Sequence, residues 1–197
     1  MATGVQIYLA SQSPRRQELL QQIVVAYRVL APDINEARLP REAPEVYVAR
    51  MARIKAEITW IRICARRMKP YPVLAADTAV VLGRNILGKP ANDEAAQNML
   101  QALSGRTHRV LTTIAIRYEK RLQLATSISK VKFRRLSDAE ITRYVATGEP
   151  KDKAGGYAIQ GLAATFIAHI EGSYTGVMGL PLFETAGLLK KFGVQVL

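Results

Sequence analysis

A chain of 197 residues with 49% hydrophobic side chains is long enough to bury the core of one domain or of two small lobes. It has no apolar stretch near the roughly 20 residues of a membrane span, no signal-peptide pattern, and one cysteine, which excludes an internal disulfide and a multi-cysteine zinc site. The net charge of +12 is scattered along the chain without a nucleic-acid-binding motif. We therefore expect a cytoplasmic protein that binds neither membranes nor, as its main role, nucleic acid.

Hydrophobic periodicity and turn residues predict alternating strands and helices along the chain. Strands are expected at residues 5–10, 26–31, 73–76, 79–82, 109–118 and 121–134. Helices are expected to begin at Pro14, near Pro44, at Asn92, at Ser137 and around Pro181. Gly83-Arg84-Asn85 is typical of a hairpin turn, and Ser137 to Glu140 form a capping box. The pattern predicts an α/β fold with a mixed sheet rather than a purely parallel, doubly wound one.

The helix from about Pro44 to Met68 has the clearest pattern. Apolar residues recur every three or four positions and predict one core-facing stripe: Tyr47, Met51, Ile54, Ile58, Ile61, Ala65 and Met68. Lys55 falls at the edge of that stripe, where its ammonium reaches either a cleft or open water. Cys64 lies in the same helix and is expected to be a packed thiol rather than a nucleophile.

The segment from residue 9 to residue 20 is typical of a phosphate site. An apolar strand is followed by Ser11 and Ser13, which can cap a helix, and by Pro14, which suits its first turn. Arg15 and Arg16 then lie beside the free N–H groups at the start of that helix. The alternative is an ordinary capped helix with exposed arginines.

Three charged side chains are candidates for chemistry. Asp77 ends an apolar strand, where ligands and catalytic groups gather in α/β folds, although a turn or cap role is the alternative. Lys89 lies in a loop between a glycine and a proline, and Glu36 lies in a polar loop.

The glycine-rich segment from Pro150 to Gly161 indicates either a loop shaped around a ligand or a solvated connector. Gln160 in this segment offers an amide donor and acceptor side by side, which match one edge of uracil or thymine. A flipped amide would match cytosine equally well. No Walker-type phosphate loop and no nucleophile elbow occur, and His108 and His169, which lack metal-ligand spacing, are expected to be structural.

Taken together, these segments resemble the Maf (septum-formation inhibitor-like) family of nucleotide pyrophosphatases. The matching pieces follow the family's order over nearly the whole chain: Ser11–Arg16, Glu36, Lys55-Ala56, Ala76–Thr78, Leu87–Pro90, Leu103–Gly105 with His108, Glu149-Pro150, Asp152–Gly155, Ile159–Gly161 and Gly179–Leu182. Gln12 departs from the glycine that is common there, and the strong positive charge is not a family signature.

The resemblance implies a Maf-like (ITPase-like) fold: one domain over residues 1–197, with an elongated mixed sheet flanked by helices and two lobes around a central cleft. It also implies a homodimer. The activity implied is hydrolysis of a nucleoside triphosphate to the monophosphate and pyrophosphate with a divalent cation, Mg²⁺ or Mn²⁺. Arg15, Lys55 and Gln160 together resemble the subfamily that acts on dTTP and UTP.

The resemblance also assigns roles to residues. Asp77 is the catalytic proton acceptor or the group that orients the attacking water, and Glu36 and Asp77 share the metal. Substrate binding falls to Ser11, Arg15, Arg16, Lys55, Lys89 and Gln160, most of them cations that suit a triphosphate. The surrounding cations are expected to keep Asp77 ionised.

Three alternatives stay open at this point. The first is a pyrophosphatase for modified purine triphosphates such as 7-methyl-GTP. The second is a nucleotide-binding regulator of cell division without relevant turnover. The third is a nucleic-acid-binding protein, which would explain the net charge of +12.

Overall fold

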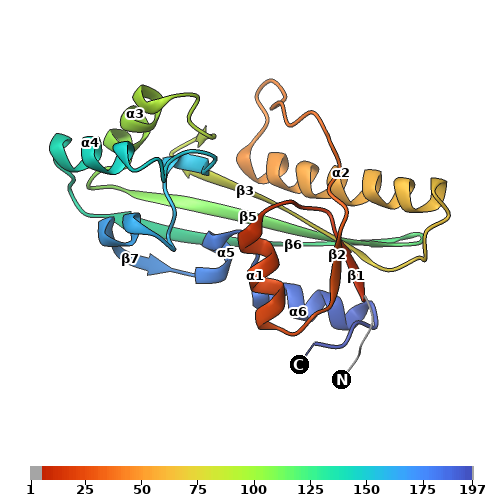
Figure 1. Cartoon of the computed structure of the whole chain (residues 1–197). Coiled ribbons are helices and arrows are strands. Elements are labelled where there is room, and N and C mark those ends of the chain that lie inside the picture. The colour runs from red at the N-terminus through yellow and green to blue at the C-terminus, as the bar shows by residue number, and fades with distance from the viewer. Residues whose placement is uncertain (1–5, 197) are drawn as a thin grey trace.

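A mixed β-sheet runs the length of the molecule, with helices on both of its faces (Figure 1). The structure is a computed structural model that describes residues 6–196. Within that range the sheet has seven strands in the order β2-β1-β3-β5-β6-β7, and β4 pairs with β3. Their bounds are β1 (Ile7–Leu9), β2 (Tyr27–Val29), β3 (Val73–Leu82), β4 (Asn85–Leu87), β5 (Thr107–Tyr118), β6 (Arg121–Phe133) and β7 (Ile167–Glu171).

Strand β3 has one edge that is only partly covered. Strand β5 pairs antiparallel with β3 along its other edge from Val73 to Val81. On the incompletely covered edge, β1 runs parallel to β3 and reaches only Leu74, while β4 pairs antiparallel from Val80 onward. Residues 76–79 therefore lack a strand partner on that edge within residues 6–196, and we call this segment the free edge of β3.

The helices divide between the faces and ends of the sheet (Figure 1). They are α1 (Pro14–Gln22), α2 (Pro44–Ala65), α3 (Asp93–Leu103), α4 (Asp138–Ala146), α5 (Tyr174–Met178) and α6 (Leu182–Lys191), with 3₁₀ turns η1 (Ala154–Gly156) and η2 (Leu162–Phe166). Helix α2 packs along β3 and β5 on one face, whereas α5 and α6 pack against β5 and β6 on the other. No helix within residues 6–196 is long and apolar enough to cross a bilayer.

The two-residue period of β3 distributes its side chains between two cores. Leu74 and Ala76 belong to the buried cluster that includes residues of α1 and α6. Val73 and Ala75 belong to the cluster under α2. The same alternation directs the side chain of Asp77 toward α2 and that of Thr78 toward the opposite face, because successive side chains of a strand point to opposite sides.

Most of the predicted elements are confirmed. The sheet is mixed, the predicted helices begin within one or two residues of the expected positions, and the capping box of Ser137 and Glu140 is formed. The two strands expected at 73–76 and 79–82 are the single strand β3, β7 was expected only as a strand region around His169, and α5 was not predicted. The strand expected at 5–10 is observed at Ile7–Leu9, and Val5 lies outside the described residues.

The apolar stripe predicted for α2 is wrong. Of its seven residues only Met51 is buried, and Ile61 is 64% exposed. The buried face is instead rotated toward small and β-branched residues, namely Val48, Ala52, Ala56, Thr59 and Ile63. Small side chains allow the helix to approach the sheet closely, so packing against β3 and β5 decides the buried face rather than the hydrophobicity of the stripe.

Cys64 is exposed, so the packed thiol expected there is wrong. The residue is helical, as predicted, but it lies in the last turn of α2, next to the buried Ile63 and outside the face that packs on the sheet.

Both histidines lie in strands, as expected, and His108 is structural. Its ring is almost fully buried, with Nε2 2.7 Å from the Tyr157 hydroxyl and the ring packed edge-on against Phe133. Burial lowers the pKa of His108 from 6.5 to about 4. The contact ties β5 to the segment that follows η1.

This buried histidine predicts a pH dependence of stability. Between pH 6.5 and about 4 the unfolded chain binds a proton at His108 that the folded chain does not, so the free energy of unfolding falls as the pH drops, by up to about 3 kcal/mol. In His108→Gln this contribution should be absent, which urea unfolding at pH 7 and pH 4.5 would measure. The matched control is His169→Gln, at an exposed position of β7. An equally steep loss in His108→Gln would contradict the assignment.

Candidate active site

Asp77 lies on the free edge of β3 and pairs with a lysine from the covering helix. Its side chain is 9% exposed, and Oδ1 accepts a hydrogen bond from Nζ of Lys55 at 2.7 Å. The same ammonium lies 2.6 Å from Oε1 of Glu36, in the loop before α2. One buried cation therefore bridges two carboxylates that are 41 residues apart in the chain.

The rotation of α2 explains how Lys55 reaches this position. Lys55 follows the buried face of Ala52 and Ala56 instead of lying at the edge of the predicted stripe, and its side chain is only 12% exposed. The helix packs closely on β3, so the lysine stem spans the short distance to the sheet. Of the two outcomes open for Lys55, the ammonium reaches the carboxylates and does not extend to open water.

Burial and charge act in opposite directions on the two carboxylates. Burial raises the pKa of Asp77, and the charges of Lys55 and Arg16 oppose this rise without overcoming it. Desolvation therefore outweighs the surrounding cations in setting the direction of this shift, and the ionised state expected for Asp77 stays a prediction. Burial also raises the pKa of Glu36, but the hydrogen bond and charge of Lys55 outweigh it and leave this pKa below its ordinary value.

Arg16 clamps the start of α1 to the other side of the free edge. Its guanidinium donates from Nε to the carbonyl of Gly179 at 2.8 Å, from Nη1 to Oγ of Ser11 at 3.0 Å and from Nη2 to Oγ1 of Thr78 at 3.2 Å. The Thr78 hydroxyl lies 2.9 Å from that of Thr112. Arg16 thus lies close to Asp77, but three of its N–H donors are already used by the protein itself.

The serines of this segment do not cap α1 as predicted. Ser13 occupies the N-cap position, yet its side chain accepts no hydrogen bond from the first turn. Ser11 is buried, and its Oγ accepts from the backbone N–H of Ser13 at 3.2 Å as well as from Arg16. The hydroxyl expected to cap the helix therefore holds an arginine in place.

Three further cations lie near enough to this site for their charges to shift the pKa of neighbouring groups. Burial lowers the pKa of Lys153, and the positive charges of Arg15 and Lys89 lower it further. Lys89 also lowers the pKa of Glu36. We call Arg15, Lys89 and Lys153 the cation cluster. No site role was predicted for Lys153, although it lies in the glycine-rich loop that the sequence singled out.

Backbone contacts fix the loops that carry the cation cluster. The N–H of Gly155 donates to the carbonyl of Gly88 at 3.0 Å, which joins the loop of Lys153 to the loop of Lys89. Gly155 has φ +72°, and a Cβ there would lie 2.9 Å from a methyl group of Val80 on β3. Only glycine meets both conditions without strain.

Gln160 is the predicted site residue that the structure does not join to the others. It is exposed, and no hydrogen bond involves its side chain within residues 6–196. Its neighbour Ile159 belongs to the same buried cluster as Ala76 and Met178, which fixes the backbone of this loop on the α6 side of the sheet. The base-recognition role of Gln160 stays a prediction.

The donor set fits a hard divalent cation with incomplete protein ligation. No group of three or more His, Cys, Asp or Glu side chains gathers anywhere in residues 6–196. Glu36 and Asp77 do converge, since both contact the Lys55 ammonium. A pair of carboxylates, completed by water and substrate phosphates, is a usual environment for Mg²⁺.

The Arg16 clamp predicts a specific loss of stability. A lysine has one ammonium and cannot reach three acceptors on different segments, so Arg16→Lys should lower the free energy of unfolding by about 1–3 kcal/mol. Urea unfolding would measure this loss against Arg53→Lys, the same change at an exposed position of α2. Equal stability of the two variants would show that the clamp contributes nothing.

Comparison with known proteins identifies the family. Residues 6–192 match the family model described as Maf-like protein. The chain is 50% identical over 196 residues to a dTTP/UTP pyrophosphatase of Polaromonas sp., with 96% of this chain and 97% of the relative covered. It is 53% identical over 196 residues to a dTTP/UTP pyrophosphatase of Aromatoleum aromaticum, with 95% of each chain covered.

A solved structure is similar over a smaller part of the chain. The Ham1 protein of Staphylococcus aureus aligns with a TM-score of 0.46 and 15% identity, over 64% of this chain and 71% of that protein. The family match and the full-length relatives confirm the resemblance noted in the sequence. This chain belongs to the Maf-like protein family.

Proposed function

We propose that this protein hydrolyses dTTP and UTP to the corresponding monophosphate and pyrophosphate with the help of a divalent cation. The observation that carries the proposal is the ion-paired arrangement of the buried Asp77 with Lys55 and Glu36 at the free edge of β3, beside a cluster of cations. The relatives that bear the name dTTP/UTP pyrophosphatase, at about half identity over nearly their whole length, support the choice of substrates.

The cations suit the charge of the substrate. A nucleoside triphosphate presents a chain of phosphates, and Arg15, Lys89 and Lys153 can bind its oxygens and stabilise the charge that develops on the departing pyrophosphate. Arg16 has a different role here, because its donors hold Ser11, Thr78 and Gly179. We assign it to positioning the first turn of α1 rather than to direct contact with phosphate.

The acidic pair suits the hydrolytic step. A water molecule attacks phosphorus, the anhydride bond between the α- and β-phosphates breaks, and the proton of the water passes to the carboxylate of Asp77. Lys55 holds that carboxylate in place through the 2.7 Å hydrogen bond. A divalent cation held by Glu36 and Asp77 would neutralise phosphate charge. The homodimer, the cytoplasmic location and the two-lobed single domain with a central cleft stay predictions that rest on resemblance and composition.

The first test is a nucleotide panel with a matched pair of variants. Pyrophosphate release from dTTP, UTP and 7-methyl-GTP is measured with Mg²⁺, with Mn²⁺ and with a chelator. We expect turnover of the two pyrimidine nucleotides only with metal, and a loss of about 10²–10⁴ in rate in Asp77→Asn because the proton acceptor is removed. Asp93→Asn, at an exposed position in the first turn of α3, should keep the full rate.

The possible outcomes separate the competing functions. Preferred turnover of 7-methyl-GTP would favour the modified-purine alternative. Absence of pyrophosphate from every nucleotide would exclude the enzyme and leave a nucleotide-binding regulator. Full activity of Asp77→Asn would remove Asp77 from the reaction.

The second test concerns the choice of base. If Gln160 recognises the pyrimidine edge, Gln160→Ala should lower the ratio of kcat/KM for UTP over GTP on the order of tenfold, the usual effect of one lost hydrogen bond. Gln101→Ala, at an exposed position of α3, is the matched control. An unchanged ratio would show that another group reads the base.

A further inference from the structure

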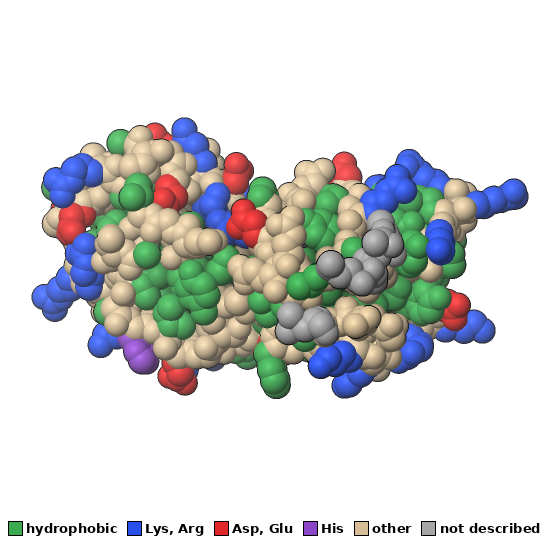
Figure 2. Space-filling model, turned by 60° about the horizontal axis from the view of Figure 1, so that its bottom comes forward, with side chains coloured by type: hydrophobic (Ala, Val, Ile, Leu, Met, Phe, Trp, Pro, Cys, Tyr) green, Lys and Arg blue, Asp and Glu red, His purple; other side chains and the backbone are tan. Residues whose placement is uncertain are grey.

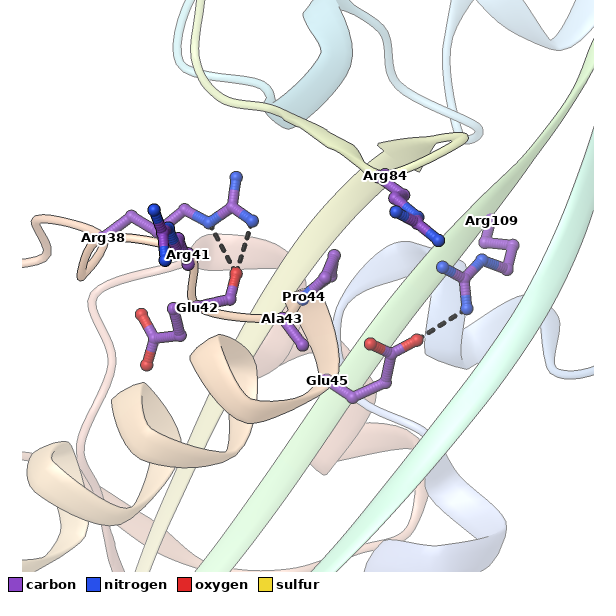
Figure 3. Close-up of a pocket in the computed structure, with 8 residues that line it drawn as sticks. All are labelled: Arg38, Arg41, Glu42, Ala43, Pro44, Glu45, Arg84 and Arg109. Atoms are coloured by element: carbon purple, nitrogen blue, oxygen red, sulfur yellow. Dashed lines mark hydrogen bonds and ion pairs between the residues drawn. The ribbon is translucent and has the colours of Figure 1, made fainter.

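A second group of cations lies around the end of the loop that carries Glu36. They line a surface pocket of about 360 Å³, formed by the end of that loop, the amino end of α2, the β3–β4 turn and β5. Four arginines line it: Arg38, Arg41, Arg84 and Arg109 (Figure 3). None of them belongs to the candidate active site, and we call this hollow the arginine pocket.

The acidic residues of the arginine pocket are already paired. Glu42 accepts two hydrogen bonds from Arg50, at 2.6 and 2.7 Å, and its pKa falls to about 2, chiefly through this contact. Glu45 forms an ion pair with Arg109 at 2.6 Å. Neither carboxylate is therefore left to neutralise the remaining arginines.

The remaining three arginines have no carboxylate partner in residues 6–196. Arg38 donates from Nε and Nη2 to the backbone carbonyl of Glu42, so its charge is not neutralised. Arg41 and Arg84 are exposed and take part in no ion pair within the described chain. Figure 3 shows Arg38 and Arg41 on one side of the first residues of α2 and Arg84 with Arg109 on the other.

This arrangement is that of an anion site. Arginines from three separate segments line one hollow, where a bound anion would relieve the repulsion between their charges. Arginine binds phosphate oxygens in pairs through its planar set of donors, which favours phosphate over a simple halide. The volume is close to the lower limit for small-molecule pockets.

We propose that the arginine pocket binds a diphosphate group, either free pyrophosphate or the phosphate tail of a nucleotide, at a site separate from Asp77. A small anion suits these observations better than a nucleic-acid strand does. The four arginines line one hollow, whereas the basic side chains on the face drawn in Figure 2 lie in separate groups and form no continuous stripe. A nucleic-acid strand would need a longer, continuous row of positive side chains along its backbone.

The experiment is calorimetric titration with inorganic pyrophosphate at about 0.15 M salt, without metal, so that no turnover takes place. Arg41→Gln/Arg84→Gln should bind one pyrophosphate fewer than the wild type, or bind it at least tenfold more weakly, because two charged donors are lost. Both positions are exposed, and unchanged thermal unfolding would show that the variant is folded. Arg15→Gln/Lys89→Gln should keep binding at the arginine pocket.

A charge-matched control distinguishes binding at a specific site from attraction by the overall positive charge of the protein. Arg66→Gln/Arg67→Gln removes the same charge from exposed positions after the end of α2 and should bind pyrophosphate as the wild type does. Wild-type binding by Arg41→Gln/Arg84→Gln, or an equal loss in the control, would overturn the proposal.

A repeat with a dTTP analogue that cannot be cleaved between its α- and β-phosphates identifies the source of the diphosphate. Tighter binding of the analogue at the pocket would point to a nucleotide tail, and tighter binding of pyrophosphate to the free anion. Turnover plays no part in these measurements, so their failure would leave the proposed hydrolysis untouched, and failure of hydrolysis would leave the pocket untouched.

Discussion

The buried ion pair of Lys55 with Asp77 depends on a gap in the sheet. Strand β1 leaves β3 after Leu74, and β4 joins it only at Val80, so the edge between them is open to side chains instead of to another strand. Lys55 approaches from the α2 face and Arg16 from the opposite face. A continuous neighbouring strand would have filled this space. At this gap Lys55 binds Asp77 on one face of the sheet and Arg16 binds the neighbouring Thr78 on the other, much as ligands meet where strand order changes in open α/β sheets.

The cations around this gap fall into two groups: those whose donors are used by the protein itself, and those of the cation cluster. Arg16 uses its donors on Gly179, Ser11 and Thr78, so it holds three segments together. Lys55 is held between Glu36 and Asp77. The cation cluster is held mainly through its backbone, since the contact of Gly155 with Gly88 joins two of its loops. Under the proposed function, such a division would hold the acidic centre in place and leave positive charge for the substrate phosphates, as preorganised electrostatic catalysis requires.

Local chemistry made several residues predictable. Asp77 could be singled out because it follows an apolar run, but the strand end expected there is wrong, since Asp77 lies inside β3. The mixed sheet follows from the alternation of strand and helix patterns. The buried face of α2 was not predictable in the same way. Its sequence offers two faces, and the one with larger side chains, including Ile61, remains partly exposed while Ala52 and Ala56 are buried. Lys153 was missed because a lysine in a polar loop looks like any solvated side chain until its neighbours are known.

The family, most of the strands and helices, and most of the charged groups near Asp77 could be predicted without a structure, because they depend on local pattern and on motifs in a fixed order. Tertiary structure decided which of those groups meet. The contact of Glu36 with Lys55, the hydrogen bond from Arg16 to Gly179 and the lining of the arginine pocket all join segments that are separate in the chain. Such contacts depend on how closely a helix packs on a sheet and where a strand ends, and neither quantity is encoded in the spacing of residues along one segment.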